Sequence, residues 1–231
     1  MLVTSLDIET TGLDRFKCQI TVVALIIYDT STNQVTRTEC FNVCLAREHS
    51  EHSEQEIKTS VRNILNDSDR LLAFNGVGFD IPWISFWLDG DNSELREAWI
   101  SKTIDYCLEA KLRLDSFVSM QKVCDDNSVG VSKTASGKQA VIWAAEKQWD
   151  KLESYCMADV EVLLALFKMC VKTGLVLKSK KSNARVMIRM GPDMHVQEVS
   201  VTKIKQLQYS TATDEQLPAA PTQSELDDIF V

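Results

Sequence analysis

The chain has 231 residues, enough for one sizeable α/β domain with a tail but hardly for two full domains. Its hydrophobic share of 45% and charged share of 25% are those of an ordinary globular protein, and no apolar run approaches the ~20 residues of a membrane helix. The N-terminus lacks the basic stretch of a secretion signal, and the formal net charge of −8 argues against a general nucleic-acid coat protein.

Seven scattered cysteines, without a CxxC pair, argue against a disulfide framework or a zinc site and favour a reducing intracellular compartment, cytoplasm or nucleus. Residues 172–205 are rich in Lys and Arg, whereas residues 206–231 contain acidic residues and no basic ones. A basic segment beside an acidic tail is compatible with a nucleic-acid contact surface, although a solvated basic face explains it equally well.

The first third of the chain predicts β structure and then a helix. Residues 2–9 predict a strand, residues 20–28 a buried strand, and residues 35–43 an alternating one. Residues 53–65 have apolar side chains at helical spacing, with Ser53 and Glu56 as a capping box. His49 and His52 form an HxxH in a polar stretch, which we interpret as a solvated loop.

From residue 71 onward, short strands alternate with helices. The apolar patterns predict strands at residues 71–74 and 102–106 and helices at residues 79–87, 115–124, 139–148 and 150–172. Period-two patterns at residues 184–190 and 195–204 predict a β-hairpin, and the Gln/Thr/Ala/Pro-rich segment from residue 206 predicts a disordered tail. This order indicates an α/β fold with a mixed central β-sheet flanked by helices and a C-terminal β-hairpin.

Four acidic side chains lie at a strand end, at a helix start and inside a helix of the predicted elements. Asp7 and Glu9 end the first strand on one face, where their repulsion favours bound Mg²⁺ or Mn²⁺, although a polar strand end is the simpler alternative. Asp80 opens a helix, where the helix dipole alone also favours an acid. Asp159 lies one turn after Tyr155 among apolar residues, where a buried acid needs a partner and an exposed one does not.

Together these elements resemble the three exonuclease motifs of the DEDD (DnaQ-like) superfamily of 3′–5′ exonucleases, whose fold is ribonuclease H-like. The resemblance covers roughly residues 2–170 and rests on Asp7-Ile-Glu9-Thr-Thr-Gly-Leu13, Asn75-x-x-x-Phe79-Asp80 and Tyr155-x-x-x-Asp159. Tyr155 matches the tyrosine subclass, DEDDy. The run from Lys133-x-x-Ser-Gly-Lys138 through Trp143 to Tyr155-Cys resembles stand-alone or helicase-associated relatives of the family-B DNA polymerase proofreading domain.

The resemblance implies two-metal hydrolysis of terminal phosphodiester bonds in single-stranded nucleic acid. It implies that two Mg²⁺ or Mn²⁺ ions are held by Asp7, Glu9, Asp80 and Asp159. Tyr155 would orient the attacking water, because a phenol with a pKa of about 10 is a poor proton acceptor. Substrate contacts are expected from Thr10, Thr11, Gly12, Leu13, Asn75, Phe79, Lys133 and Lys138. Phe79 also suits a core position, the two lysines also suit a solvated connector, and Asp105 is interpreted as a supporting residue.

The last residues interrupt the polar tail with large apolar side chains. Gln223, Leu226, Ile229 and Phe230 resemble the clamp-binding peptide of replication proteins, the PIP box, although Ile229 stands where an aromatic residue is usual. A single 3₁₀ turn would place the three apolar side chains on one side, ready for a hydrophobic pocket of a sliding clamp. The alternative is a tail that packs on its own domain.

We therefore expect an exonuclease domain over residues 1–173, a β-hairpin extension of that domain over residues 174–205, and a tail over residues 206–231. The polymerase-like subclass and the tail favour DNA over RNA as the substrate, although no single residue distinguishes the two sugars. The competing hypothesis is a catalytically silent module of the same fold that recruits nucleic acid or a partner. The presence of all four carboxylates counts against it.

Overall fold

A computed structural model describes residues 1–90, 92–130, 137–182 and 184–199. By their internal contacts, the residues divide into two compact units. The first comprises Met1–Tyr106 and Lys133–Leu164, and the second comprises Cys107–Ser132 and Ala165–Val231. The domain limits expected from the sequence, at residues 173 and 206, stay a prediction.

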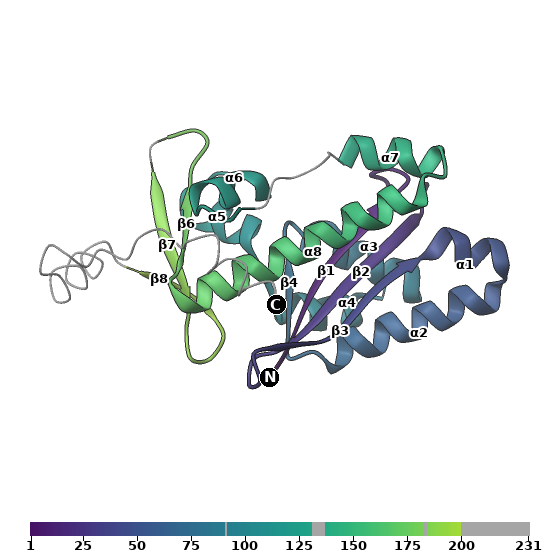
Figure 1. Cartoon of the computed structure of the whole chain (residues 1–231), viewed down its shortest axis with the longest axis horizontal. Helices are drawn as coiled ribbons and strands as arrows, with labels where there is room; N and C mark the ends of the chain where they lie inside the picture. Colours follow the sequence, from purple (N-terminus) through teal and green to yellow (C-terminus); the bar gives the residue numbers. More distant parts are fainter. Residues whose placement is uncertain (91, 131–136, 183, 200–231) are drawn as a thin grey trace, which may run out of the picture. The chain divides into compact units, whose positions relative to one another are not determined.

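A five-stranded mixed sheet forms the centre of the first unit (Figure 1). Its strands are β1 (Leu2–Thr10), β2 (Ile20–Asp29), β3 (Gln34–Asn42), β4 (Arg70–Ala73) and β5 (Thr103–Asp105). They lie in the order β3-β2-β1-β4-β5; β1, β2 and β3 pair antiparallel, whereas β4 pairs parallel with both β1 and β5. The five strands predicted from the sequence and the mixed sheet are thereby confirmed.

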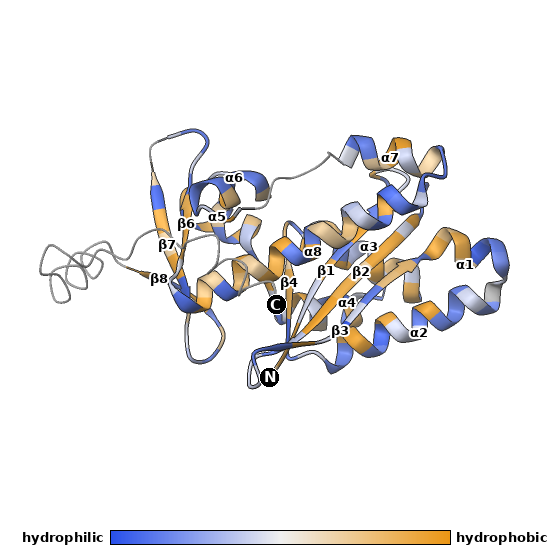
Figure 2. Ribbon diagram, viewed as in Figure 1, coloured by the Kyte–Doolittle hydropathy of each residue, from blue (hydrophilic) through white to orange (hydrophobic). Residues whose placement is uncertain are grey.

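Helices supply the other layers of the first unit. They are α1 (Val43–His49), α2 (Glu51–Asp67), α3 (Asp80–Asp89), α4 (Ser93–Ser101), α7 (Gly137–Ala145) and α8 (Trp149–Lys172) up to Leu164. Figure 2 shows β2 hydrophobic over most of its length, as a strand buried on both faces requires, and α2 alternating between hydrophobic and hydrophilic residues. A core cluster joins one sheet face to α2, α3 and α4, whereas α8 crosses the other face (Figure 1).

Several local predictions were wrong. The N-cap of α2 is Ser50, whose hydroxyl accepts the Ser53 N–H at 3.1 Å, so the capping box expected at Ser53 does not begin the helix. His49 ends α1 and His52 lies inside α2, so the HxxH is helical rather than a loop. The helices α1, α4 and α5 (Tyr106–Leu114) were not predicted, and residues 115–119 precede α6 (Met120–Asp126) instead of belonging to a helix.

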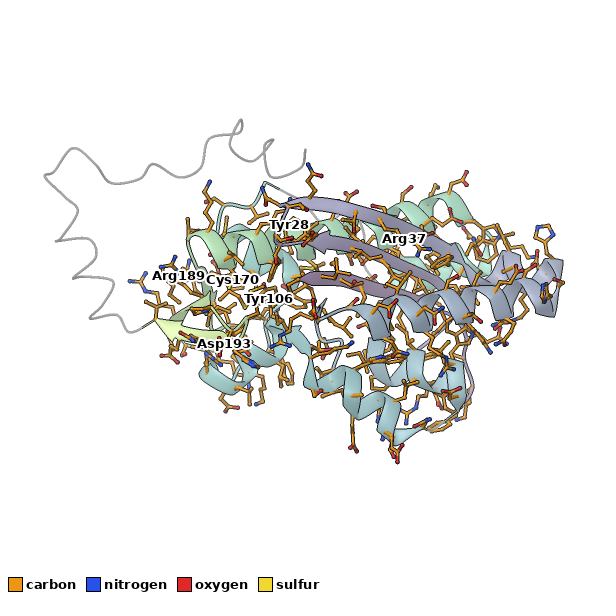
Figure 3. The ribbon with its side chains drawn as sticks, turned by 90° about the horizontal axis from the view of Figure 1, so that it is seen from below. Tyr28, Arg37, Tyr106, Cys170, Arg189 and Asp193 are labelled. Atoms are coloured by element: carbon orange, nitrogen blue, oxygen red, sulfur yellow. The ribbon has the colours of Figure 1, made fainter. Side chains whose placement is uncertain are left out.

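The second unit contains a three-stranded antiparallel sheet in the order β6-β7-β8, formed by β6 (Leu175–Lys178), β7 (Arg185–Met190) and β8 (Val196–Val199). The predicted hairpin is β7–β8, and β6 is an additional strand. Asn127 fixes β6 after α6: its side-chain amide donates to the Val176 carbonyl at 2.8 Å and accepts from the Val176 N–H at 2.7 Å. Figure 3 shows Arg189 of β7 beside Cys170 of α8.

All seven cysteines lie in the described residues and are free thiols. Within the described ranges, the helices are too short or too polar to cross a membrane.

Candidate active site

Asp7 and Glu9 lie near the end of β1, on the sheet face that α8 crosses. The preceding residue with the same orientation, Ser5, donates its hydroxyl to the Val160 carbonyl of α8 at 2.8 Å. Leu6 and Ile8, at the alternate positions, are buried in the core cluster of the opposite face. The period-two alternation of a strand therefore places both carboxylates on one face, opposite Leu6 and Ile8, as predicted, and this is the face that α8 crosses. Oxygens of Asp7 and Glu9 lie within 4.8 Å of each other and of the Cys156 thiol.

Asp80 reaches the same place from the neighbouring strand β4. The turn after β4 is held by Asp105, whose carboxylate accepts the N–H groups of Asn75 at 2.8 Å and Val77 at 3.0 Å. Asn75 has a φ of 66°, in the left-handed region that asparagine tolerates better than most residues. Helix α3 then begins at Asp80, which is 4% exposed and accepts the Ile8 N–H of β1 at 3.1 Å.

Asp159 and Tyr155 come from α8, one helical turn apart. Both are buried, at 7% and 4% exposure, and an aspartate is seldom buried to this extent. The Tyr155 ring packs edge-on against Trp143 of α7, with ring centroids 6.0 Å apart. Asn42, at the end of β3, donates to the Glu153 carboxylate of α8 at 2.7 Å. Contacts of α8 with β1 and β3 thus hold this turn of the helix over the sheet.

The acidic groups destabilise one another's charges. Burial raises the pKa of Asp7 well above its ordinary value, and the charges of Asp80, Glu9 and Asp159 raise it further. Burial, with smaller contributions from Asp105 and Asp159, raises the pKa of Asp80 to about 7, even though backbone N–H groups oppose the shift. The four carboxylates predicted from three separate segments therefore form one electrostatic cluster.

The donor set of this cluster fits a hard divalent cation. Carboxylate oxygens are the protein ligands that Mg²⁺ and Mn²⁺ prefer. The strongest influences on Asp7 are desolvation and negative charge, both of which a bound cation would offset. Asp7, Glu9, Asp80 and Asp159 are the residues that could hold such a cation.

Two further residues support the site. No role was predicted for Cys156, and Asp105 was predicted only to be a supporting residue. Cys156 is fully buried, and its thiol donates to Asp7 Oδ2 at 3.3 Å and to the Asp7 carbonyl at 3.5 Å. Burial, followed by the charges of Asp7 and Glu9, raises the pKa of the Cys156 thiol well above its ordinary value, so the thiol remains a donor. Its position next to Tyr155 in the sequence was the available signal. Asp105, interpreted as a supporting residue, holds the turn that leads to Asp80.

We expect Cys156→Ala to lower the hydrolysis rate by about 10-fold, because Asp7 would lose a donor that fixes its orientation. Cys156→Ser should recover most of the rate, since a hydroxyl can donate to the same oxygen. Initial rates at saturating Mg²⁺ would measure this, with Cys44→Ala of α1 as the matched control. If Cys156→Ala and Cys156→Ser are both as active as the wild type, the thiol does not position Asp7.

The residues of the β1–β2 loop that are expected to contact substrate differ in their exposure. Thr10 is buried and donates its hydroxyl to the Gly12 carbonyl at 2.7 Å, whereas Thr11 accepts the Gln19 N–H at 3.0 Å and closes the loop. Leu13 is 87% exposed at the tip of this loop. A Cβ at Gly12 would lie 2.7 Å from the Cys18 sulfur, which explains a glycine there.

The second group of expected contacts lies in the turn before α3 and at the start of α7. Asn75 is exposed in the turn that leads from β4 to Asp80 at the start of α3. Phe79 is partly buried against the core cluster, with its ring 5.6 Å from that of Trp83, so its main contact is with the core. Lys138 is exposed in the first turn of α7. The remaining expected residues lie outside the described ranges: Lys133, Gln223, Leu226, Ile229 and Phe230.

Gly76 is the residue of the Asn75–Gly78 turn that tolerates a side chain least. A Cβ there would lie 2.3 Å from the Ala73 Cβ and 3.3 Å from Asp80 Oδ2. We expect Gly76→Ala to destabilise the fold by about 1–3 kcal/mol and to displace Asp80, with a loss of activity greater than the loss of folded protein. Thermal unfolding and initial rates would measure both effects. Gly137→Ala, where a Cβ meets nothing within 4 Å, is the control; equal behaviour of the two variants would contradict the prediction.

Comparison with solved structures found similar chains at low identity. One is the family B DNA polymerase from the hyperthermophilic archaeon Pyrobaculum calidifontis, with 13% identity over 74% of this chain and 25% of that chain, and a TM-score of 0.48. Another is E. coli exonuclease I in complex with a 5cy-dT13 oligonucleotide, with 12% identity over 100% of this chain and 68% of that chain, and a TM-score of 0.43. The chain therefore spans a quarter of the polymerase and about two thirds of exonuclease I.

No curated protein matches the sequence. The family model RNase_H_2, described as RNase_H superfamily, matches residues 5–171. The match spans most of the chain and includes Asp7, Glu9, Asp80, Tyr155 and Asp159. It confirms the ribonuclease H-like fold that the three motifs predicted. The chain belongs to the RNase H superfamily.

Proposed function

We propose that the protein is a metal-dependent 3′–5′ exonuclease that hydrolyses terminal phosphodiester bonds of single-stranded nucleic acid, with DNA as the favoured substrate. The observation that carries the proposal is the convergence of Asp7, Asp80 and Asp159 from three elements, together with Glu9, in a site where their charges repel. A fold gains no stability from such a cluster, whereas a catalytic metal site requires it.

Different residues would have different roles in hydrolysis. Divalent cations held by the four carboxylates would neutralise charge that develops on the phosphate and lower the pKa of the attacking water. Tyr155 would orient that water through its hydroxyl, and its packing against Trp143 limits the movement of the ring. The loop of Thr10 to Leu13, which closes through Thr11 and Gln19, would hold the terminal nucleotide. The exposed Asn75 amide would contact its sugar or phosphate.

The test is digestion of single-stranded oligonucleotides labelled at either end, with Mg²⁺ or Mn²⁺. We expect the 3′ label to be released at once as a mononucleotide and the 5′ label to remain on a ladder of shortened products. Asp7→Ala and Asp80→Ala should be inactive, whereas Asp150→Asn, an exposed acid of α8, should match the wild type. Matched DNA and RNA strands would establish the sugar preference. Equal traces for all variants would refute the catalytic assignment and favour the catalytically silent module.

We further propose that the chain's C-terminus tethers it to a sliding clamp through Gln223, Leu226, Ile229 and Phe230. The spacing of these residues supports the proposal, because an aliphatic and two further apolar side chains suit one hydrophobic pocket. A peptide of residues 206–231 should bind a sliding clamp in a direct binding assay, and Phe230→Ala should abolish that binding. Absence of binding by the unmodified peptide would refute the tether.

A further inference from the structure

The loop between β1 and β2 exposes two large apolar side chains, Leu13 at 87% and Phe16 at 67%. Leu13 is one of the residues that are expected to contact the terminal nucleotide. Phe16 has no part in the core, in the motifs or in the cluster of carboxylates. An isolated exposed apolar residue needs no explanation, but Phe16 is held in place by contacts that give it a defined orientation.

Two neighbours fix the Phe16 ring, and the three residues Arg15, Phe16 and Phe86 form what we name the Phe16 platform. The ring meets the ring of Phe86 on α3 edge to face, with centroids 5.2 Å apart at 75°. The Arg15 guanidinium lies 4.7 Å from the Phe16 centroid. An aromatic ring held this way keeps an exposed surface at low entropic cost, which favours binding to a flat ligand.

The backbone of the loop is also fixed. Asp14 accepts the Phe16 N–H on its carboxylate at 3.0 Å, and its carbonyl accepts the N–H groups of Lys17 and Cys18 at 3.0 and 2.8 Å. The ends of the loop are joined by the hydrogen bond from Thr11 N–H to the Gln19 carbonyl at 2.9 Å. Phe16 therefore occupies a set position relative to β1 and its two carboxylates.

Helix α3 relates the platform to the carboxylate cluster. Asp80 begins α3 and Phe86 follows six residues later, which corresponds to about 9 Å along a helix that rises 1.5 Å per residue. This distance is longer than the terminal nucleotide alone. The nucleotides that precede it in an extended single strand would reach that far.

We propose that Phe16 stacks on a base upstream of the terminal nucleotide of a single-stranded nucleic acid whose 3′ end lies among the carboxylates. The proposal rests on the proposed function for the position of the 3′ end. Stacking on an aromatic face tolerates any base, so the platform would add affinity without sequence preference. It would also make affinity and rate depend on the length of the strand.

Phe117 supplies a matched control. It is a second exposed phenylalanine, at 61%, with the Lys111 ammonium 5.4 Å from its ring centroid, but it lies in the other unit of the chain. If any exposed phenylalanine beside a cation promoted binding, then Phe16→Ala and Phe117→Ala would have equal effects.

The test measures equilibrium binding of 5′-fluorescein dT₁₀ and U₁₀ to the full chain in EDTA at low salt, and hydrolysis of dT₁₀ and of the dinucleotide dT₂ with Mg²⁺. We expect Phe16→Ala to weaken dT₁₀ binding and its kcat/KM by about 10-fold, as for the loss of one base–aromatic stack, and to leave dT₂ hydrolysis within about twofold. Phe16→Trp should retain wild-type values, and Phe117→Ala should change neither quantity.

The outcomes separate the inference from the proposed function. Binding that depends on Phe16, without any hydrolysis by the wild type, would support the stack and refute the exonuclease. Wild-type binding by Phe16→Ala, equal losses on dT₁₀ and dT₂, or a wild type that binds neither oligonucleotide would overturn the stack. Self-association that Phe16→Ala abolishes, together with unchanged oligonucleotide binding, would assign the platform to a second copy of the chain and also overturn it.

Discussion

In metal-free buffer at pH 8, Asp7→Asn is expected to unfold at a higher temperature than the wild type, although it should lose about 1,000-fold in hydrolysis rate. Asparagine keeps the shape of the side chain and an oxygen that can accept the Cys156 thiol. It removes one charge from a site where burial and three other acids already raise the pKa of Asp7. We expect a gain of several degrees, because 1 kcal/mol corresponds to about 2–4 °C in a chain of this size.

Adding Mn²⁺ should reverse the order of the two proteins. The wild type would gain stability by binding the ion, whereas Asp7→Asn would gain little because it lacks a ligand. Differential scanning calorimetry with and without Mn²⁺ would measure both effects, with Asp150→Asn as the control at an exposed acid of the same helix as Asp159. A metal-free Asp7→Asn that melts below the wild type would contradict the account of the cluster as a site of charge repulsion.

The metal-free wild type is also expected to lose stability as the pH rises from 5 to 8. Asp80 has a pKa of about 7 in the folded chain, above its ordinary value of 3.8. The folded state therefore binds a proton more tightly than the unfolded state, and stability falls as this proton is lost. From Asp80 alone the loss is about 3 kcal/mol, or about 6–12 °C in Tm. The raised pKa of Asp7 acts in the same direction.

Between pH 5 and 8, acids whose pKa is lowered by folding do not change their contribution to stability. Glu54, which is bonded to Arg47, has a pKa lowered to about 2, so its contribution is complete above pH 5 and is lost only in stronger acid. Thermal unfolding at several pH values in EDTA would measure the effect, and Asp80→Asn should flatten the profile. Saturating Mg²⁺ should flatten it as well. A wild type that grows more stable between pH 5 and 8 in EDTA would refute the prediction.

The sequence predicted the sheet well because its strands have strong local signals. The apolar run of β2 directly indicates a strand that is buried on both faces. The helices α1, α4 and α5 were missed because each has seven to nine residues, too few for a clear helical period. The N-cap at Ser50 was missed because it depends on one hydrogen bond, from the Ser53 N–H to the Ser50 hydroxyl, that local spacing does not reveal.

Those parts of the candidate site that depend on residue type were predicted from the sequence. Those that depend on contacts between distant residues were not. The sequence alone identified the acids at a strand end, at a helix start and inside a helix as candidate metal ligands. The hydrogen bond from Cys156 to Asp7 joins residues 149 positions apart, and nothing near either residue indicates it. The contact of Phe16 with Phe86 is likewise a product of tertiary structure.

We propose that Asp7, Glu9, Asp80 and Asp159 together form a divalent-metal site. Its most direct test is an anomalous difference map from a crystal of the full chain soaked in MnCl₂, with diffraction recorded near the manganese edge. We predict a strong peak bounded by the carboxylate oxygens of Asp7, Glu9 and Asp159, which is absent from a crystal of Asp7→Asn soaked in the same way. A map that has manganese elsewhere on the protein but none among these carboxylates would contradict the claim.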